Sequence, residues 1–283
     1  MLPEGVDVTR ELENKVCLIA GASGAIGSAV CELFCRHGAQ LALGSCAHQA
    51  AVRLAGRAPV GRTLALPFDV CSWDEVCGAF ERVQDHFGGL DVLVNCVGIQ
   101  GPIGPTHTLA PDEWARTIEV NLLGAFHLIR AAVPLMLHRG GGKIIQLAGG
   151  GAAYARPFFT AYSAAKSALV RFTECLAEEL RDANIQVNAI APGPVRSRMW
   201  DEMRAAGAAC GPKALREIAQ LDETGGVPAS RAAALALFLA SPRSNGLTGR
   251  LISGVHDRWE DFPGKISEIM NTEGGTLRRV PLG

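Results

Sequence analysis

Val16-Cys-Leu-Ile-Ala-Gly-Ala-Ser-Gly-Ala-Ile-Gly27 joins an apolar run to a glycine-rich turn and then to the start of an amphipathic pattern. Gly21, Gly24 and Gly27 fall where a predicted strand gives way to a predicted helix. Glycine lets the backbone turn sharply and approach a pyrophosphate, and free N–H groups at a helix start offset its charge. This arrangement is typical of a dinucleotide-binding turn. A glycine-rich turn that holds no ligand is the alternative.

Beyond this turn, short β-rich runs alternate with longer amphipathic runs. Strands are predicted at residues 15–20, 40–43, 63–67, 92–96, 143–147, 185–190 and 249–253, and helices at 25–37, 73–87, 112–137, 159–181 and 229–240. The alternation predicts an α/β fold with a doubly wound parallel sheet, Rossmann-like, in a single domain of residues 1–283. We expect its core at about 15–253, a substrate lid with one or two short helices at about 196–227, and a C-terminal tail at 254–283 that is either docked or disordered.

The composition argues against several classes of function. The 283 residues carry a formal net charge of −1 and no concentrated basic segment, so no nucleic-acid partner is expected. The beginning of the chain lacks a signal-peptide pattern, and we expect no apolar stretch long enough and free enough of glycine and charge to span a bilayer. The expected protein is therefore soluble and cytoplasmic, without a membrane partner. The nine cysteines lack paired metal-ligand spacings, so no metal site is expected.

The segment Phe159-Thr-Ala-Tyr-Ser-Ala-Ala-Lys-Ser-Ala contains two side chains suited to acid–base chemistry, Tyr162 and Lys166. A spacing of i, i+4 places both side chains on one face of a helix. A cation held one turn away favours the phenolate, and this lowers the pKa of the phenol toward the range useful for acid–base catalysis. An ordinary surface pair is the alternative.

Taken together, these motifs resemble the short-chain dehydrogenase/reductase family over about residues 15–253. The resemblance implies a nicotinamide cofactor, with Tyr162 as the acid or base, Lys166 as its partner and Asn121 as the residue that helps to position water and the lysine. The cofactor-binding residues that the resemblance implies are Gly21, Ser23, Gly24, Ile26, Gly27, Ser45, Asp69, Val70, Asn95, Gly98, Tyr162, Lys166, Pro192 and Val195. For Asp69, a contact with the adenine amino group and a plain helix cap are equally good interpretations.

The family pattern breaks at one catalytic position, because Gly149 stands where the family has a serine that hydrogen-bonds the substrate carbonyl. We favour other donors in its place, either the backbone N–H groups of the glycine run 149–151 or a side chain among Thr160, Tyr154 and His107. Slow or altered chemistry is the alternative. Substrate contacts are assigned to Gly149, Gly150 and Tyr154, although a structural role is favoured for the side chains of His107 and Tyr154.

Cofactor preference depends on the end of the second strand. Ser45 and Cys46 provide neither an acid for the ribose hydroxyls of NAD nor an arginine for the 2′-phosphate of NADP. His48 or Arg53 would assist a phosphate, so NADP is slightly favoured over NAD.

We therefore predict an NAD(P)-dependent oxidoreductase that interconverts a secondary alcohol and a ketone on a small molecule, with a loose suggestion of a sugar or secondary metabolite. An epimerase or dehydratase of the same fold, or a nucleotide-binding module with reduced catalysis, are the alternatives. An apolar stripe also predicts a homodimer or homotetramer, although burial within one subunit gives the same pattern; the stripe consists of Leu169, Phe172, Leu176 and Leu180.

Overall fold

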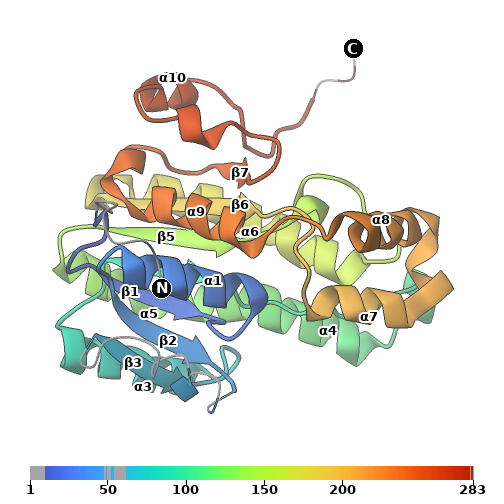
Figure 1. Ribbon diagram of the computed structural model, residues 1–283, viewed down its shortest axis with the longest axis horizontal. Coiled ribbons are helices and arrows are strands. Elements are labelled where there is room, and N and C mark those ends of the chain that lie inside the picture. The colour runs from blue at the N-terminus through green and yellow to red at the C-terminus, as the bar shows by residue number, and fades with distance from the viewer. Residues whose placement is uncertain (1–9, 48, 50–51, 54–61, 281, 283) are drawn as a thin grey trace.

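A seven-stranded parallel sheet forms the centre of the protein, in the order β3-β2-β1-β4-β5-β6-β7 (Figure 1). The computed structural model describes residues 10–47, 49, 52–53, 62–280 and 282. The strands are β1 (Val16–Ala20), β2 (Gln40–Ser45), β3 (Thr63–Pro67), β4 (Val92–Asn95), β5 (Gly142–Leu147), β6 (Ile185–Ala191) and β7 (Leu251–Ser253). The strand order reverses between β1 and β4, which places a ligand crevice at their carboxyl ends.

Helices cover both faces of the sheet, because the central strands are apolar on both sides. In β1, Cys17 and Ile19 belong to one core cluster, and Leu18 and Ala20 belong to the other. The first cluster includes α1 (Ala25–Arg36) and α9 (Ala229–Ala240), and the second includes α3 (Trp73–Phe87), α5 (Gly124–His138) and α6 (Thr160–Glu179). The predicted doubly wound parallel sheet in a single domain is confirmed.

The long helix predicted at 112–137 is interrupted in the structure. It consists of α4 (Pro111–Ile118), a π-helical turn η2 (Glu119–Leu123) and α5. A π-turn inserts an extra residue and is frequently found at a functional site. By length and composition alone, the helix Pro111–His138 contains an 18-residue window apolar enough to cross a membrane, contrary to the expectation that no stretch qualifies. Its α5 part packs on the sheet as a core helix.

The predicted lid contains two helices, α7 (Arg198–Ala206) and α8 (Gly211–Thr224), joined by η5 (Gly207–Cys210). They lie at the end of the sheet toward which the β5 arrow points (Figure 1). Their apolar side chains form a separate cluster around Phe159, which consists of Trp200, Met203, Cys210, Ala214, Ile218 and Leu221. The remaining short helices are η1 (Thr106–Thr108), η3 (Gly150–Ala152), η4 (Arg181–Ala183), η6 (Pro242–Ser244), η7 (Trp259–Asp261) and α10 (Ile266–Met270).

The described part of the C-terminal tail docks on the body of the same chain. Trp259 is 6% exposed and packs in the cluster of α1 and α9, with its ring centroid 5.9 Å from that of Phe238. The apolar stripe on α6 is also used inside the subunit, since Leu169 is fully buried and Leu176 is 8% exposed. Burial within one subunit thus accounts for these two residues of the stripe, and assembly into oligomers stays a prediction.

Leu93 is fully buried in β4, so its substitution measures how much a core side chain of the central sheet contributes to the free energy of unfolding. Leu93→Ala is expected to lower the free energy of unfolding by about 2–5 kcal/mol, since it removes buried apolar atoms and leaves a cavity. Urea unfolding followed by circular dichroism measures this. Leu282→Ala is the matched control, because Leu282 is 93% exposed and its change should cost almost nothing. Equal losses in the two variants would contradict this account of the core.

Candidate active site

A cavity of about 1530 Å³ lies across the carboxyl ends of the strands. Its wall contains the glycine-rich turn after β1, the segment just after β4, the ends of β2, β5, β6 and β7, the start of α6, and helices α7 and α8. This position follows from the topology, since the carboxyl ends of parallel strands meet at one edge where the strand order reverses.

Two positions of the glycine-rich turn have no room for a Cβ atom, so only glycine fits there. Gly21 has a φ of +76°, and a Cβ added there would lie 2.9 Å from the carbonyl carbon of Cys96. A Cβ at Gly27 would lie 2.2 Å from the Gly21 oxygen, so α1 can start close to the turn only with glycine at this position. Gly24 is the N-cap of α1 with extended backbone, and Ile26 in the first helical turn also lines the cavity.

Ser23 in this turn binds the end of β2. The hydroxyls of Ser23 and Ser45 lie 2.9 Å apart, and the Ala47 N–H donates to the Ser45 hydroxyl over 3.1 Å. Both serines line the cavity. Arg53 is described but is not among the lining residues, and His48 lies outside the described residues.

Asp69 and Val70 follow β3 and line the same cavity. The Asp69 carboxylate accepts the Cys71 N–H over 2.9 Å and lies 3.4 Å from the Arg116 guanidinium. The backbone hydrogen bond from Cys71 lowers the pKa of Asp69, and Arg116 adds to this effect. The N-cap of α3 is Ser72, whose hydroxyl accepts the Glu75 N–H. The helix-cap interpretation of Asp69 is therefore wrong.

Asn95 and Asn121 hold the chain after β4 in place. The Asn95 amide donates to the Gln146 side chain over 2.8 Å and its oxygen accepts the Val97 N–H. Asn121, in the π-helical turn, donates to the Ile99 carbonyl over 3.0 Å and accepts the Ile99 N–H over 3.3 Å. A Cβ at Gly98 would lie 2.8 Å from the Asn121 oxygen and 3.4 Å from Lys166 Nζ, so glycine lets these three groups meet.

Tyr162 and Lys166 lie on α6 at the floor of the cavity. Lys166 is 2% exposed, donates from Nζ to the Leu147 carbonyl over 2.8 Å, and lies 5.8 Å from the centre of the Tyr162 ring. Burial lowers the pKa of Lys166 to about 8. Burial also raises the pKa of Tyr162, and the charge of Arg156 opposes this rise. The expected lowering of the Tyr162 pKa by Lys166 is therefore not found, because burial raises this pKa and the opposing charge is that of Arg156.

Gly149 lies beside the Tyr162 hydroxyl. A Cβ added at Gly149 would lie 3.1 Å from Tyr162 Oη, which is tighter than an ordinary contact. Gly149 and Gly150 lie at the start of a short turn. In its first hydrogen bond, the Ala152 N–H donates to the Gly149 carbonyl. A side chain at position 149 would therefore point at the Tyr162 ring and its hydroxyl.

The other candidate donors have different positions. Thr160 and His107 are not among the residues that line the cavity, and the Thr160 hydroxyl accepts from Trp114 over 3.3 Å. Tyr154 lines the cavity but its side chain is largely exposed. On the far side of the cavity, Pro192 and Val195 form the loop after β6, and the Pro194 carbonyl accepts the Val227 N–H over 2.9 Å.

Two arginines of the cavity wall, Arg116 and Arg156, were not predicted from the sequence. Arg116 pairs with Asp69, as described above. Arg156 donates to Glu217 of α8 over 2.9 Å and stacks 4.5 Å from the centre of the Phe159 ring. A signal for Arg156 was present, because it lies in the loop just before the Tyr162 helix, but its partner comes from the distant lid.

Comparison with known proteins agrees with this geometry. Residues 15–207 match the model of the short chain dehydrogenase family. The 3-oxoacyl-(acyl-carrier-protein) reductase FabG of Thermotoga maritima is 32% identical over 250 residues, covering 85% of this chain and 96% of that protein.

Two solved structures are also similar. A 7α-hydroxysteroid dehydrogenase complexed with NADH and 7-oxoglycochenodeoxycholic acid aligns with a TM-score of 0.76 and 25% identity, covering 87% of this chain and 94% of that one. NAD⁺-bound xylitol dehydrogenase aligns with a TM-score of 0.76 and 26% identity, covering 86% and 98%. The chain belongs to the short-chain dehydrogenase/reductase family and is an NAD(P)-dependent oxidoreductase by this membership.

Proposed function

We propose that this protein interconverts a secondary alcohol and a ketone on a small molecule, with Tyr162 as the acid or base. The observation that carries the proposal is the position of Tyr162, which lies in the same cavity as the glycine-rich turn and beside the open backbone at Gly149. A nucleotide whose pyrophosphate is bound at Gly21 would extend toward Tyr162. A substrate carbonyl next to Tyr162 would therefore lie near its nicotinamide end.

The cavity fits a nicotinamide nucleotide. Its walls run from Asp69 and the turn at Gly21 to Lys166 and the loop at Val195. Glycine at 21 and 27 lets the turn pack closely against the chain after β4 and the start of α1, where a Cβ would collide with backbone atoms. When bound, the nucleotide supplies or takes up the hydride. Ser45, Gly21 and Val195 would hold it, and Lys166 would donate to its ribose.

We propose that NADP is favoured over NAD. A carboxylate at the end of β2 would grip the ribose hydroxyls of NAD and repel a 2′-phosphate. The serine at this position is buried at 5% exposure, and its hydroxyl contacts Ser23 and the Ala47 N–H. The similar structures contain NAD⁺ or NADH, so competitive titration with both nucleotides decides this point.

The proton chemistry follows from the surroundings of Tyr162. Because burial raises its pKa, the phenol holds its proton at neutral pH and can give it to a carbonyl oxygen. The Lys166 ammonium group lies one helical turn away and supplies positive charge as the phenolate forms. Asn121 fixes the backbone at Ile99, next to Gly98, and so keeps the wall around Lys166 in place.

At Gly149 we propose that the backbone N–H groups of the turn take the role of the missing hydroxyl. Glycine allows a substrate oxygen to approach these groups closely. The alternative is an epimerase or dehydratase, which is favoured only by the lack of a side-chain donor beside Tyr162. Exchange of a substrate proton without a net change in nucleotide absorbance would distinguish it.

Tyr162→Phe is expected to reduce turnover of a panel of ketones by roughly 10²- to 10⁴-fold, because the general acid is lost. Nucleotide absorbance measures turnover, and fluorescence titration measures the nucleotide dissociation constant, which should stay nearly unchanged. Tyr154→Phe is the comparison variant, since Tyr154 is the other tyrosine, and loss of its hydroxyl should reduce turnover far less because this side chain is 76% exposed at the cavity wall. Full activity in Tyr162→Phe would remove the assignment.

Lys166 predicts a pH dependence of nucleotide affinity. Its pKa of about 8 means that the ammonium form dominates below that pH and the neutral amine above it. Only the ammonium form gives a charge-assisted hydrogen bond to the ribose, so affinity should be constant below pH 8 and fall above it. Titration between neutral and alkaline pH measures this.

The control is Lys143→Met. Burial lowers the pKa of Lys143 to about 8 as well, but its Nζ donates to Ser244 and Asn245 away from the cavity. Lys143→Met should keep the pH dependence and Lys166→Met should lose it. The reverse result would show that another group causes the effect.

Gly149→Ala and Gly149→Ser test the backbone proposal together. Alanine places a methyl group close to Tyr162 Oη without adding a donor, so kcat/KM for ketones should fall by about ten- to a hundredfold. Serine has the same steric effect and adds a hydroxyl. If the backbone already serves the substrate oxygen, the two variants should have similar kcat/KM. A gain of about 10²-fold or more in the serine variant over the alanine variant would contradict the proposal.

A further inference from the structure

The segment Thr272–Arg278 follows the last strand and lies beyond the residues that match the family, yet it reaches the cavity. Gly275, Thr276 and Leu277 are among the residues that line it, together with Leu251 of β7. The same large space that contains Tyr162 therefore has a wall formed by the C-terminal tail.

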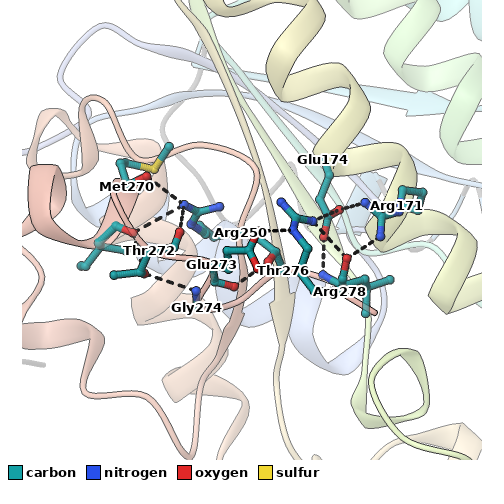
Figure 2. Close-up of polar contacts among 11 residues, drawn as sticks. Arg171, Glu174, Arg250, Met270, Thr272, Glu273, Gly274, Thr276 and Arg278 are labelled. Carbon is teal, nitrogen blue, oxygen red and sulfur yellow. Dashed lines mark hydrogen bonds and ion pairs between the residues drawn. The ribbon is translucent and has the colours of Figure 1, made fainter. Parts of the chain in front are cut away.

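Backbone contacts hold the tail along the outer edge of the sheet. The Leu251 N–H of β7 donates to the Gly275 carbonyl over 2.7 Å. Arg250 is 8% exposed and donates from Nη2 to the Thr272 carbonyl over 2.8 Å and to the carbonyls of Ile269 and Met270 over 3.4 Å (Figure 2). Because these acceptors are backbone carbonyl oxygens, Arg250 holds the backbone of the tail in place independently of the side chains of the tail.

A second anchor comes from Glu174 on α6, the helix that carries Tyr162. Its side chain is 10% exposed and accepts the Leu277 N–H over 2.6 Å. Arg278 lies 3.3 Å from the same carboxylate, and Arg171 pairs with it and also donates to the Leu277 carbonyl (Figure 2). A largely buried carboxylate with three donors is strongly tied to them, since loss of one partner would leave charge uncompensated.

Leu277 connects this anchor to the turn at Gly149. Its side chain packs against a small apolar cluster that contains Ala148 and Ala152, which flank the glycine run, and Val170 of α6. The turn itself has little side-chain mass of its own, because residues 149–151 are all glycine. Leu277 thus packs on the cluster in which the two alanines that flank the turn are buried.

We propose that Leu277, held by Glu174, is a specificity-determining and positioning residue. It closes the tail side of the substrate space and fixes the turn at Gly149. This inference rests on the proposed function, because it concerns the substrate end of the same cavity. The competing explanation is that the tail only covers the edge of β7, as edge strands are commonly protected.

The first experiment compares Leu277→Ala with the wild type on a homologous series of methyl ketones of increasing chain length. The smaller side chain should shift the ratio of kcat/KM for the longest ketone over the shortest by about tenfold or more toward the longest. The nucleotide dissociation constant should stay unchanged. Leu282→Ala is the matched control, because Leu282 belongs to the same tail and is 93% exposed.

The second experiment needs no turnover and follows hydrogen exchange in residues 148–154 and 272–278. Glu174→Gln should speed exchange in both segments, because loss of the charge weakens the hold on the tail and the tail supports the turn. Glu178→Gln is the control one helical turn further along, where the glutamate is exposed and pairs with Arg181. This control should change neither segment.

Faster exchange of the tail alone, with an unchanged ketone ranking in Leu277→Ala, would show that the tail merely covers the sheet edge and would overturn the proposal. Absence of any ketone turnover in the wild type, combined with faster exchange of both segments, would contradict the proposed function while supporting the contact between tail and turn. If the wild type reduces no ketone and Glu174→Gln leaves hydrogen exchange in residues 148–154 unchanged, both the proposed function and the role of Leu277 are wrong.

Discussion

Lys166 brings an ammonium group into the protein interior, where its only hydrogen bond within the described residues is to the Leu147 carbonyl at the end of β5. Burial of a charge is costly without a partner, so this bond fixes the distance between α6 and the sheet. The position of Tyr162 follows from it, since both residues lie on one face of α6. The turn that begins at Gly149 follows from it as well, because Leu147 is the last residue of the strand that leads into that turn. Within the described part of the chain, the geometry of the chemistry thus depends on one helix-to-strand contact.

Local patterns predicted most of the fold. The helices at 73–87 and 229–240 have the bounds that hydrophobic periodicity gives, because each ends at a strong local signal such as Gly88 in a left-handed conformation. The π-helical turn at Glu119–Leu123 was not predicted, since it continues the same apolar pattern and differs only by one extra residue in a turn. Periodicity reports which face of a helix is buried, and it is insensitive to such an insertion.

The candidate site was predictable where its residues are close in sequence, and less so where they meet through the fold. Gly21 and the pair Tyr162 and Lys166 could be placed from spacing alone. The ion pair of Asp69 with Arg116 and the docking of Leu277 on Glu174 join segments far apart in the chain, and no local pattern specifies them. The direction of the Tyr162 pKa was misjudged for a related reason. Spacing shows that a cation is near, but the cost of desolvation depends on the surrounding chain.

Burial acts on Tyr162 and Lys166 in the same sense, because it favours the uncharged form of each side chain. It raises the pKa of Tyr162 and lowers that of Lys166, so in both cases the neutral form gains. A neutral phenol is a proton donor, which is the form that reduction of a ketone requires, whereas oxidation of an alcohol requires a base. Lys166 still carries its charge below pH 8 and can stabilise the phenolate once the proton has left. Under the proposed function, Tyr162 therefore holds at neutral pH the proton that it would give to a ketone oxygen.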